Sequence, residues 1–294
     1  SMNLILQEVW ANYQLGESLI SEPHMQATPF LDYVKWQKRQ DDQEAKRFWT
    51  EELGKFRYQE QFVQTTPSQR NSYVSAVKSV ALAQDEVYTV REFSRKNQLT
   101  INTVVLGAWG LAQARLFAQH DVLIGMITSG RVPEIEQMDK MVGLFTNSLP
   151  VRLTYSDTDQ VKAWFVALQK KIVTIRRYEY ITLQQIAQWS QIPLDFLQTV
   201  INTRSLVYTH FPFQGQAGEQ RPFQAESSGQ LHLPLRLFVN PGEEHFTIRA
   251  EYDSNQFAHD TVAQLLDEVK RLLVAIPSAD GVADLWAEAK NQIK

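Results

Sequence analysis

The sequence predicts an α/β fold in which a mixed sheet is flanked by helices. Some stretches carry apolar residues at helical spacing, whereas others alternate or stay apolar for only a few residues, as strands do. These helix and strand signals are interleaved along 294 residues. They lack the regular alternation of a Rossmann sheet, so we expect a mixed rather than a fully parallel sheet.

The composition is that of a globular protein, with 44% hydrophobic and 21% charged residues. A net charge of -4 gives no electrostatic footprint for nucleic acid. The chain has no cysteine and six scattered histidines, which argues against disulfides, a thiolate metal site or a cysteine nucleophile. Neither a signal peptide nor a long apolar span is evident. We therefore expect a cytoplasmic protein without a bound metal, a membrane partner or a nucleic-acid partner.

Four elements are predicted in the N-terminal region. Helical spacing indicates an amphipathic helix over Leu4–Tyr13, which ends before Gly16. A polar connector follows over residues 17–28. Aromatic residues then mark a helix over Phe30–Trp36, and an acidic N-terminus begins another over Asp41–Leu53.

The next segment contains two strands and two helices. Alternation predicts a strand over Tyr73–Leu82, and helical spacing predicts Asp85–Gln98 and Ile101–Phe117. Thr100 is the expected N-cap of the second helix, which is apolar enough to be buried on most sides. The continuous apolar run Val122–Thr128 is typical of a strand covered on both faces.

The remaining elements follow from the same periodicities. We expect helices over residues 159–178, 183–189 and 261–275. We expect strands over residues 206–211, 233–239 and 246–252, and a further strand at the end of the segment 141–153.

Ser129-Gly130-Arg131 directly follows the apolar strand and is the first candidate site. Glycine permits close backbone approach, and arginine brings a permanent charge to a buried strand end. A buried arginine needs a carboxylate or several carbonyl partners. From the residues alone, the simplest interpretation is an internal salt bridge that fixes the strand end.

Two more polar residues lie near predicted strands. Asn147 is in a bend before a strand, where asparagine usually satisfies its own backbone. His210 is near the end of an apolar strand and could transfer a proton, although a lone histidine is more often a hydrogen-bonded core residue. The motifs of dinucleotide-binding proteins, P-loop enzymes, zinc proteases and serine hydrolases are absent.

The order of these segments resembles the condensation domain of nonribosomal peptide synthetases, in the chloramphenicol-acetyltransferase-like superfamily. Asp121–Arg152 is similar to the family's strand, Ser-Gly-Arg loop and Met-Val-Gly-Leu-Phe-x-Asn-x-Leu-Pro-x-Arg block. Tyr208–Pro212 resembles a Phe-Glu-Asn-Tyr-Pro strand, with Thr209 and His210 departing from that pattern. The likeness extends over nearly the whole chain.

The family's His-His-x-x-x-Asp-Gly motif does not occur in this sequence. In the family this motif is followed by Trp-Ser-Met and a helix, so Ser1-Met2 is either native sequence just downstream of the motif or a cloning scar. The resemblance implies a residual N-lobe helix and connector over residues 1–28. It implies a chloramphenicol-acetyltransferase-like C-terminal lobe over residues 29–294.

The resemblance implies a parent enzyme that forms amide bonds between carrier-bound acyl or peptidyl donors and aminoacyl acceptors. Substrates would arrive on phosphopantetheine arms, with no bound cofactor. The expected partners are carrier proteins, the missing N-terminal lobe and an adenylation domain. Ser129, Gly130 and Arg131 would form the lobe junction, where Arg131 pairs with the motif's aspartate, while Asn147 and His210 would line the tunnel.

No catalytic residue is expected in this chain, which alone would be inactive. A noncatalytic module that recruits carrier proteins or a tailoring enzyme is the alternative. An epimerising relative fits the Ser-Gly-Arg and Gly-Leu-Phe-x-Asn blocks less well.

Overall fold

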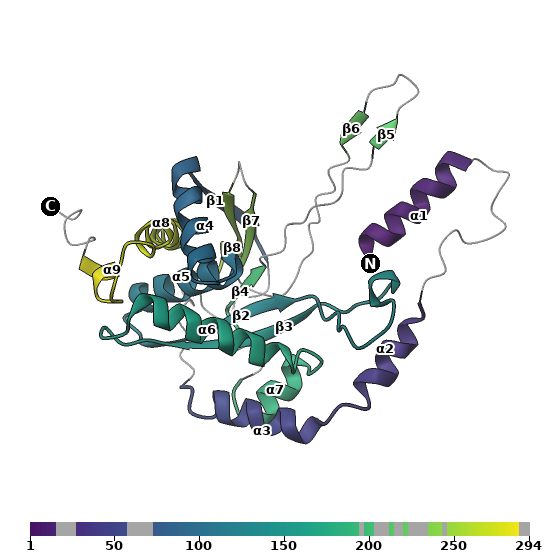
Figure 1. The fold of residues 1–294 in the computed structure, drawn as a ribbon, viewed down its shortest axis with the longest axis horizontal. Helices are drawn as coiled ribbons and strands as arrows, with labels where there is room; N and C mark the ends of the chain where they lie inside the picture. Colours follow the sequence, from purple (N-terminus) through teal and green to yellow (C-terminus); the bar gives the residue numbers. More distant parts are fainter. Residues whose placement is uncertain are drawn as a thin grey trace. The chain divides into compact units, whose positions relative to one another are not determined.

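The structure is a computed structural model that describes residues 1–15, 28–57, 73–193, 197–202, 212–214, 220–222, 235–242 and 246–287 (Figure 1). The chain divides into two compact units. The first unit comprises Ser1–Asp42, Ser129–Asn147 and Leu206–Leu231. The second unit comprises Gln43–Thr128, Ser148–Ser205 and His232–Lys294.

A mixed six-stranded sheet has the order β1-β8-β7-β4-β2-β3. Its strands are β1 (Ser75–Leu82), β2 (Asp121–Thr128), β3 (Asn147–Thr154), β4 (Thr199–Asn202), β7 (Leu235–Pro241) and β8 (Phe246–Asp253). β8 is antiparallel to both β1 and β7, whereas β4 is parallel to both β7 and β2. The predicted fold class, a mixed sheet with flanking helices, is confirmed.

β1 forms one edge of the sheet and pairs with β8 from Ser75↔Asp253 to Leu82↔Phe246. Exposure alternates along β1, which is the period of two that predicted the strand. The Asp253 carboxylate also accepts a hydrogen bond from the backbone N–H of Val74 at 3.1 Å. The first strand of the chain therefore pairs with the last strand, β8.

Helices pack on this sheet and on one another. They include α4 (Gln84–Lys96), α5 (Ile101–Leu116), α6 (Val161–Arg176) and α8 (His259–Ala275). α5 contacts α8, α6 and β2, and α8 contacts β1 and β8. No helix in the described part of the chain combines the length and apolar character that a membrane span requires.

The predicted burial of α5 is confirmed, because every residue from Thr103 to Ala114 is buried. The Thr100 hydroxyl accepts a hydrogen bond from the Thr103 N–H at 3.1 Å, as expected of an N-cap. Gly107 lets α6 approach closely, since a Cβ there would lie 2.3 Å from Cε1 of Phe165. The apolar face of α6 is therefore fixed against the core.

The first unit has a small core of its own. It contains α1 (Met2–Leu15), α2 (Phe30–Gln37) and the short helix η3 (Met138–Lys140). Tyr33 packs with Met138, Met141 and Phe145, and its ring meets that of Phe145 edge-on at 5.0 Å. The residues after Gly130 are thus folded against α2.

Other elements differ from the predictions or extend them. α3 (Asp42–Leu53) and α7 (Leu183–Ser190) occur where helices were expected. β4, the short strands β5 (Pro212–Gln214) and β6 (Gln220–Pro222), and α9 (Asp284–Ala287) were not predicted. The strand expected over 206–211 lies outside the described residues.

Candidate functional site

The turn at Ser129-Gly130-Arg131 requires glycine at its centre. Gly130 has φ +60°, and a Cβ at this position would lie 1.7 Å from the carbonyl oxygen of Phe145. The Arg131 N–H donates to the Ser129 hydroxyl at 3.2 Å. The turn therefore brings two parts of the loop into backbone contact and sets the direction of the Arg131 side chain.

Arg131 is half-buried and donates to main-chain carbonyls. Its Nη2 donates to the Met141 carbonyl at 2.9 Å, and its Nη1 donates to the Met138 carbonyl. Its guanidinium carbon lies 4.6 Å from the centroid of the Phe145 ring. Carbonyl dipoles and the ring face both favour the positive charge. Carbonyl partners were one of the two ways in which the sequence allowed a buried arginine to be satisfied.

The residue that precedes α1 lies at the same loop. The Ser1 hydroxyl donates to the Gly143 carbonyl at 2.7 Å, accepts from the Gly143 N–H at 3.1 Å, and is 3.4 Å from Nη2 of Arg131. Gly143 also accommodates the ring of Phe30, because a Cβ there would lie 2.1 Å from Cδ2 of that ring. The residue before α1 and the first residue of α2 thus both contact the Arg131 loop.

The other two candidate residues have different outcomes. Asn147 is half-buried, begins β3 and belongs to the same unit as Arg131. His210 lies outside the described residues, so its location stays a prediction. Within the described residues, no group of three or more histidine, aspartate or glutamate side chains could hold a metal ion.

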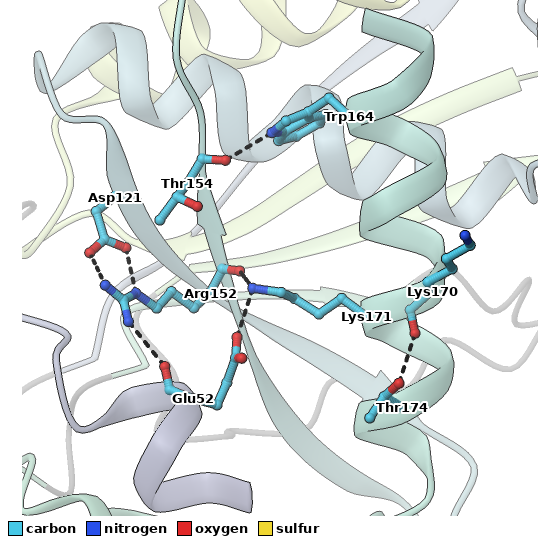
Figure 2. A network of polar contacts seen from close by, with 8 residues as sticks. All are labelled: Glu52, Asp121, Arg152, Thr154, Trp164, Lys170, Lys171 and Thr174. Atoms are coloured by element: carbon cyan, nitrogen blue, oxygen red, sulfur yellow. Dashed lines mark hydrogen bonds and ion pairs between the residues drawn. The ribbon is translucent and has the colours of Figure 1, made fainter. Parts of the chain in front are cut away.

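A polar network in the second unit was not predicted (Figure 2). The Arg152 guanidinium donates to both carboxylate oxygens of Asp121, through Nε at 2.9 Å and Nη2 at 2.7 Å. Its Nη1 donates to the Glu52 carbonyl at 3.1 Å. Lys171 donates to the Glu52 carboxylate at 2.7 Å and to the Arg152 carbonyl at 2.9 Å. Side chains from α3, β2, β3 and α6 are thereby joined.

The charges in this network balance, with two carboxylates and two cations. The hydrogen bond from Arg152 to Asp121 raises the pKa of the arginine, against the opposing effect of its desolvation. A surface pocket beside the network is lined in part by Thr154, Trp164 and Lys171. With each charge compensated by an opposite one, the arrangement suits a structural role better than proton transfer.

The sequence contained one usable signal for this network. Lys171 is three residues after Leu168 and four before Ile175, and both of these are buried residues of α6. Helical spacing therefore places Lys171 on the inward face. The partners of Arg152 could not be found in this way, because they depend on the strand order.

The described histidines lie in the second unit. The Tyr252 hydroxyl is 2.5 Å from Nδ1 of His259, and the His120 ring is 4.9 Å from that of Tyr155. Burial raises the pKa of Tyr252 and that of Tyr155. The Ser129–Asn147 loop itself contains no histidine.

The mixed sheet and the glycine-centred arginine loop agree with the resemblance to condensation domains that the sequence suggested. The family model of the condensation domain matches residues 1–279, and the chain belongs to that family. Condensation domains of nonribosomal peptide synthetases catalyse peptide-bond formation.

The relatives of this chain include two components of the linear gramicidin synthase of Brevibacillus parabrevis. One is 31% identical over 290 residues, and that alignment covers 93% of this chain and 6% of the relative. The other is 30% identical over 285 residues, covering 93% of this chain and 4% of the relative. The chain therefore spans a small part of these relatives.

Solved structures show the same fold. A four-domain nonribosomal peptide synthetase, holo-AB3403 bound to AMP and glycine, matches 97% of this chain and 23% of its own, with a TM-score of 0.77 and 12% identity. The condensation domain of the monacolin K polyketide synthase MokA matches 91% of this chain and 65% of its own, with a TM-score of 0.69 and 15% identity.

Proposed function

We propose that this chain is the C-terminal lobe of an amide-forming condensation domain and is inactive alone. In the reaction, the amine nitrogen of a carrier-bound acceptor attacks the thioester carbon of a carrier-bound donor. A carbon–nitrogen bond forms, the carbon–sulfur bond breaks, and the amine proton ends on the released thiol. Family membership supports this chemistry, and the missing histidine motif supports the need for a second lobe.

The observation that carries the proposal is the location of Arg131. Its Nη2 is 3.4 Å from the hydroxyl of Ser1, the residue before α1. In the family the histidine motif comes directly before this helix. Residues that precede Ser1 in the parent would therefore arrive beside the guanidinium, where the motif's aspartate could pair with it.

In this proposal Ser129, Gly130 and Arg131 form the lobe junction. Asn147 and His210 line the tunnel through which two phosphopantetheine arms enter. The partners are carrier-protein domains, an adenylation domain and the N-terminal lobe, in the cytoplasm.

Complementation tests the need for the second lobe. The purified chain is mixed with an N-terminal lobe that carries the histidine motif, a donor-loaded carrier and an acceptor-loaded carrier. Mass spectrometry then follows amide product on the acceptor carrier. We expect product only when both lobes are present. Product from this chain without the added lobe would contradict the proposal, and binding of carriers without product from any combination would favour a recruitment module.

Substitution in the parent tests the junction. Removing Arg131 would leave an aspartate without its partner at the junction, so Arg131→Ala should lower the stability of the parent, by about 3–5 kcal/mol if that aspartate is fully buried. Arg131→Lys should recover part of this loss, because it retains the charge. An Arg131→Ala parent that melts like the wild type but loses activity would instead assign Arg131 to substrate contact.

A further inference from the structure

α6 carries only basic charge. Its sequence, VKAWFVALQKKIVTIR, contains four cationic residues and no acidic one, in a chain whose net charge is -4. Lys171 is held by Glu52 at 2.7 Å, and Nε of Arg176 is 3.8 Å from a carboxylate oxygen of Glu179. These two cations have carboxylates nearby, whereas Lys162 and Lys170 form no ion pair within the described part of the chain.

Five residues form a stripe along α6 and its C-cap, at spacings of four, four, three and four. We name this set, Lys162, Val166, Lys170, Val173 and Arg177, the α6 stripe. Cations and valines alternate along it. Residues at these spacings lie on one face of a helix, so the cations follow one another at about 10–12 Å.

The α6 stripe is accessible. Its three cations are exposed, Val173 is 57% exposed and Val166 is half-buried. Figure 2 shows Lys170 pointing away from the polar network, whereas its neighbour Lys171 points into it. Within the described residues, none of the stripe's three cations forms an ion pair. The buried residues of α6, which are Val161, Phe165, Leu168 and Ile175, lie on another face of the helix.

Lys162 is located where a cation does not help the helix. It is the second residue of α6, and the first turn contains no acidic residue. The N-terminus of a helix has a partial positive charge, so glutamate would stabilise this position better than lysine. A residue that opposes the local preference without a compensating contact indicates a requirement outside the helix.

We propose that the α6 stripe docks an acidic helical surface of another protein. Its alternating cations would meet carboxylates, and the two valines would meet apolar side chains between them. The partner that we assign is a carrier-protein domain, and this assignment rests on the proposed function.

The test is a binding titration of the whole chain with a recombinant holo carrier-protein domain of net negative charge, followed by fluorescence anisotropy at low salt. Lys162→Glu combined with Lys170→Glu should weaken binding by roughly tenfold or more. Lys46→Glu combined with Lys55→Glu, at two exposed lysines outside the stripe, produces the same change in net charge and should leave the affinity nearly unchanged. Val173→Asp should also weaken binding.

Two measurements complete the test. Changing carboxylates to lysines on the carrier's docking helix should restore binding to the Lys162/Lys170 variant but not to the wild type. Thermal melting should show Lys162→Glu to be at least as stable as the wild type, which would separate docking from folding.

Equal affinities for the wild type and the stripe variants would overturn the proposal, as would equal losses in the stripe and control variants. Self-association that disappears in the stripe variant, without carrier binding, would overturn the assignment of the partner. The proposed function fails separately: no amide product from complementation, together with carrier binding that still depends on the stripe, would reject the proposed function and leave the docking proposal standing.

Discussion

The ion pair between Arg152 and Asp121 should contribute measurably to the stability of the second unit. Two hydrogen bonds of 2.9 and 2.7 Å join the side chains, and Arg152 makes a third bond of 3.1 Å to the Glu52 carbonyl. Their side chains are 18% and 34% exposed, between the fully exposed and fully buried cases. Arg152→Met should therefore cost about 2–3 kcal/mol, and Asp121→Asn about 1–2 kcal/mol.

A double-mutant cycle isolates the pair itself. Combining the two substitutions should give a coupling free energy of about 1–2 kcal/mol, measured by urea unfolding followed by circular dichroism. The matched control is the exposed pair Lys35–Asp32, which is 55% and 48% exposed. Its coupling should be below about 0.5 kcal/mol.

Salt dependence supplies the refuting result. In about 1 M salt the Debye length is near 3 Å, so the control coupling should vanish while most of the Arg152–Asp121 coupling persists. Equal coupling in the two pairs, or loss of both in salt, would refute the claim that partial burial strengthens the Arg152 pair.

Three further predictions concern the turn, a cap and pH. Gly130→Ala should lower the free energy of unfolding by at least about 2 kcal/mol, because φ +60° strains alanine and its Cβ would meet Phe145. The control is Gly281→Ala, where the nearest atom would lie 3.6 Å from the added Cβ, and this variant should melt within about 1 °C of the wild type. Thr100→Ala should lower the free energy of unfolding by about 1 kcal/mol. Thr100→Ser keeps the capping hydroxyl and should therefore retain most of the wild-type stability. Burial raises the pKa of Tyr252, so its neutral form stabilises the fold below its ordinary pKa and this stability is lost as the pH rises through the raised value. Ionisation of tyrosine, followed by absorbance above about pH 10, should accompany this loss of stability. A pH profile of unfolding that Tyr252→Phe leaves unchanged would contradict the prediction.

Local signals predicted most of the helices and the longer strands. Thr100 and the apolar run after it were sufficient for α5, and alternation from Ala76 to Leu82 was sufficient for β1. β4 has only four residues, Thr-Val-Ile-Asn, which is too few to show a period. Its identity as a strand comes from β2 and β7 on its two sides, which no local pattern records.

The candidate site was predictable to a similar extent. Gly130 and Arg131 were found because strand ends deliver polar side chains to loops, and the resemblance gave Arg131 a proposed partner. The carbonyl groups that receive Arg131 could not be predicted, because they depend on how the chain turns back at Met138 and Met141. The Asp121–Arg152 pair depends on strand order in the same way.

The pairing of β1 with β8 sets a timing problem for biosynthesis. The hydrogen bond that closes this edge joins residues 179 positions apart. At ribosomal rates, the ribosome completes β8 about 10 to 35 s after it has synthesised β1. During that interval Val77, which is 54% exposed even in the folded chain, and the apolar residues on the other side of β1 have no sheet to join. Protection of the nascent chain over this period should therefore affect the yield of folded protein.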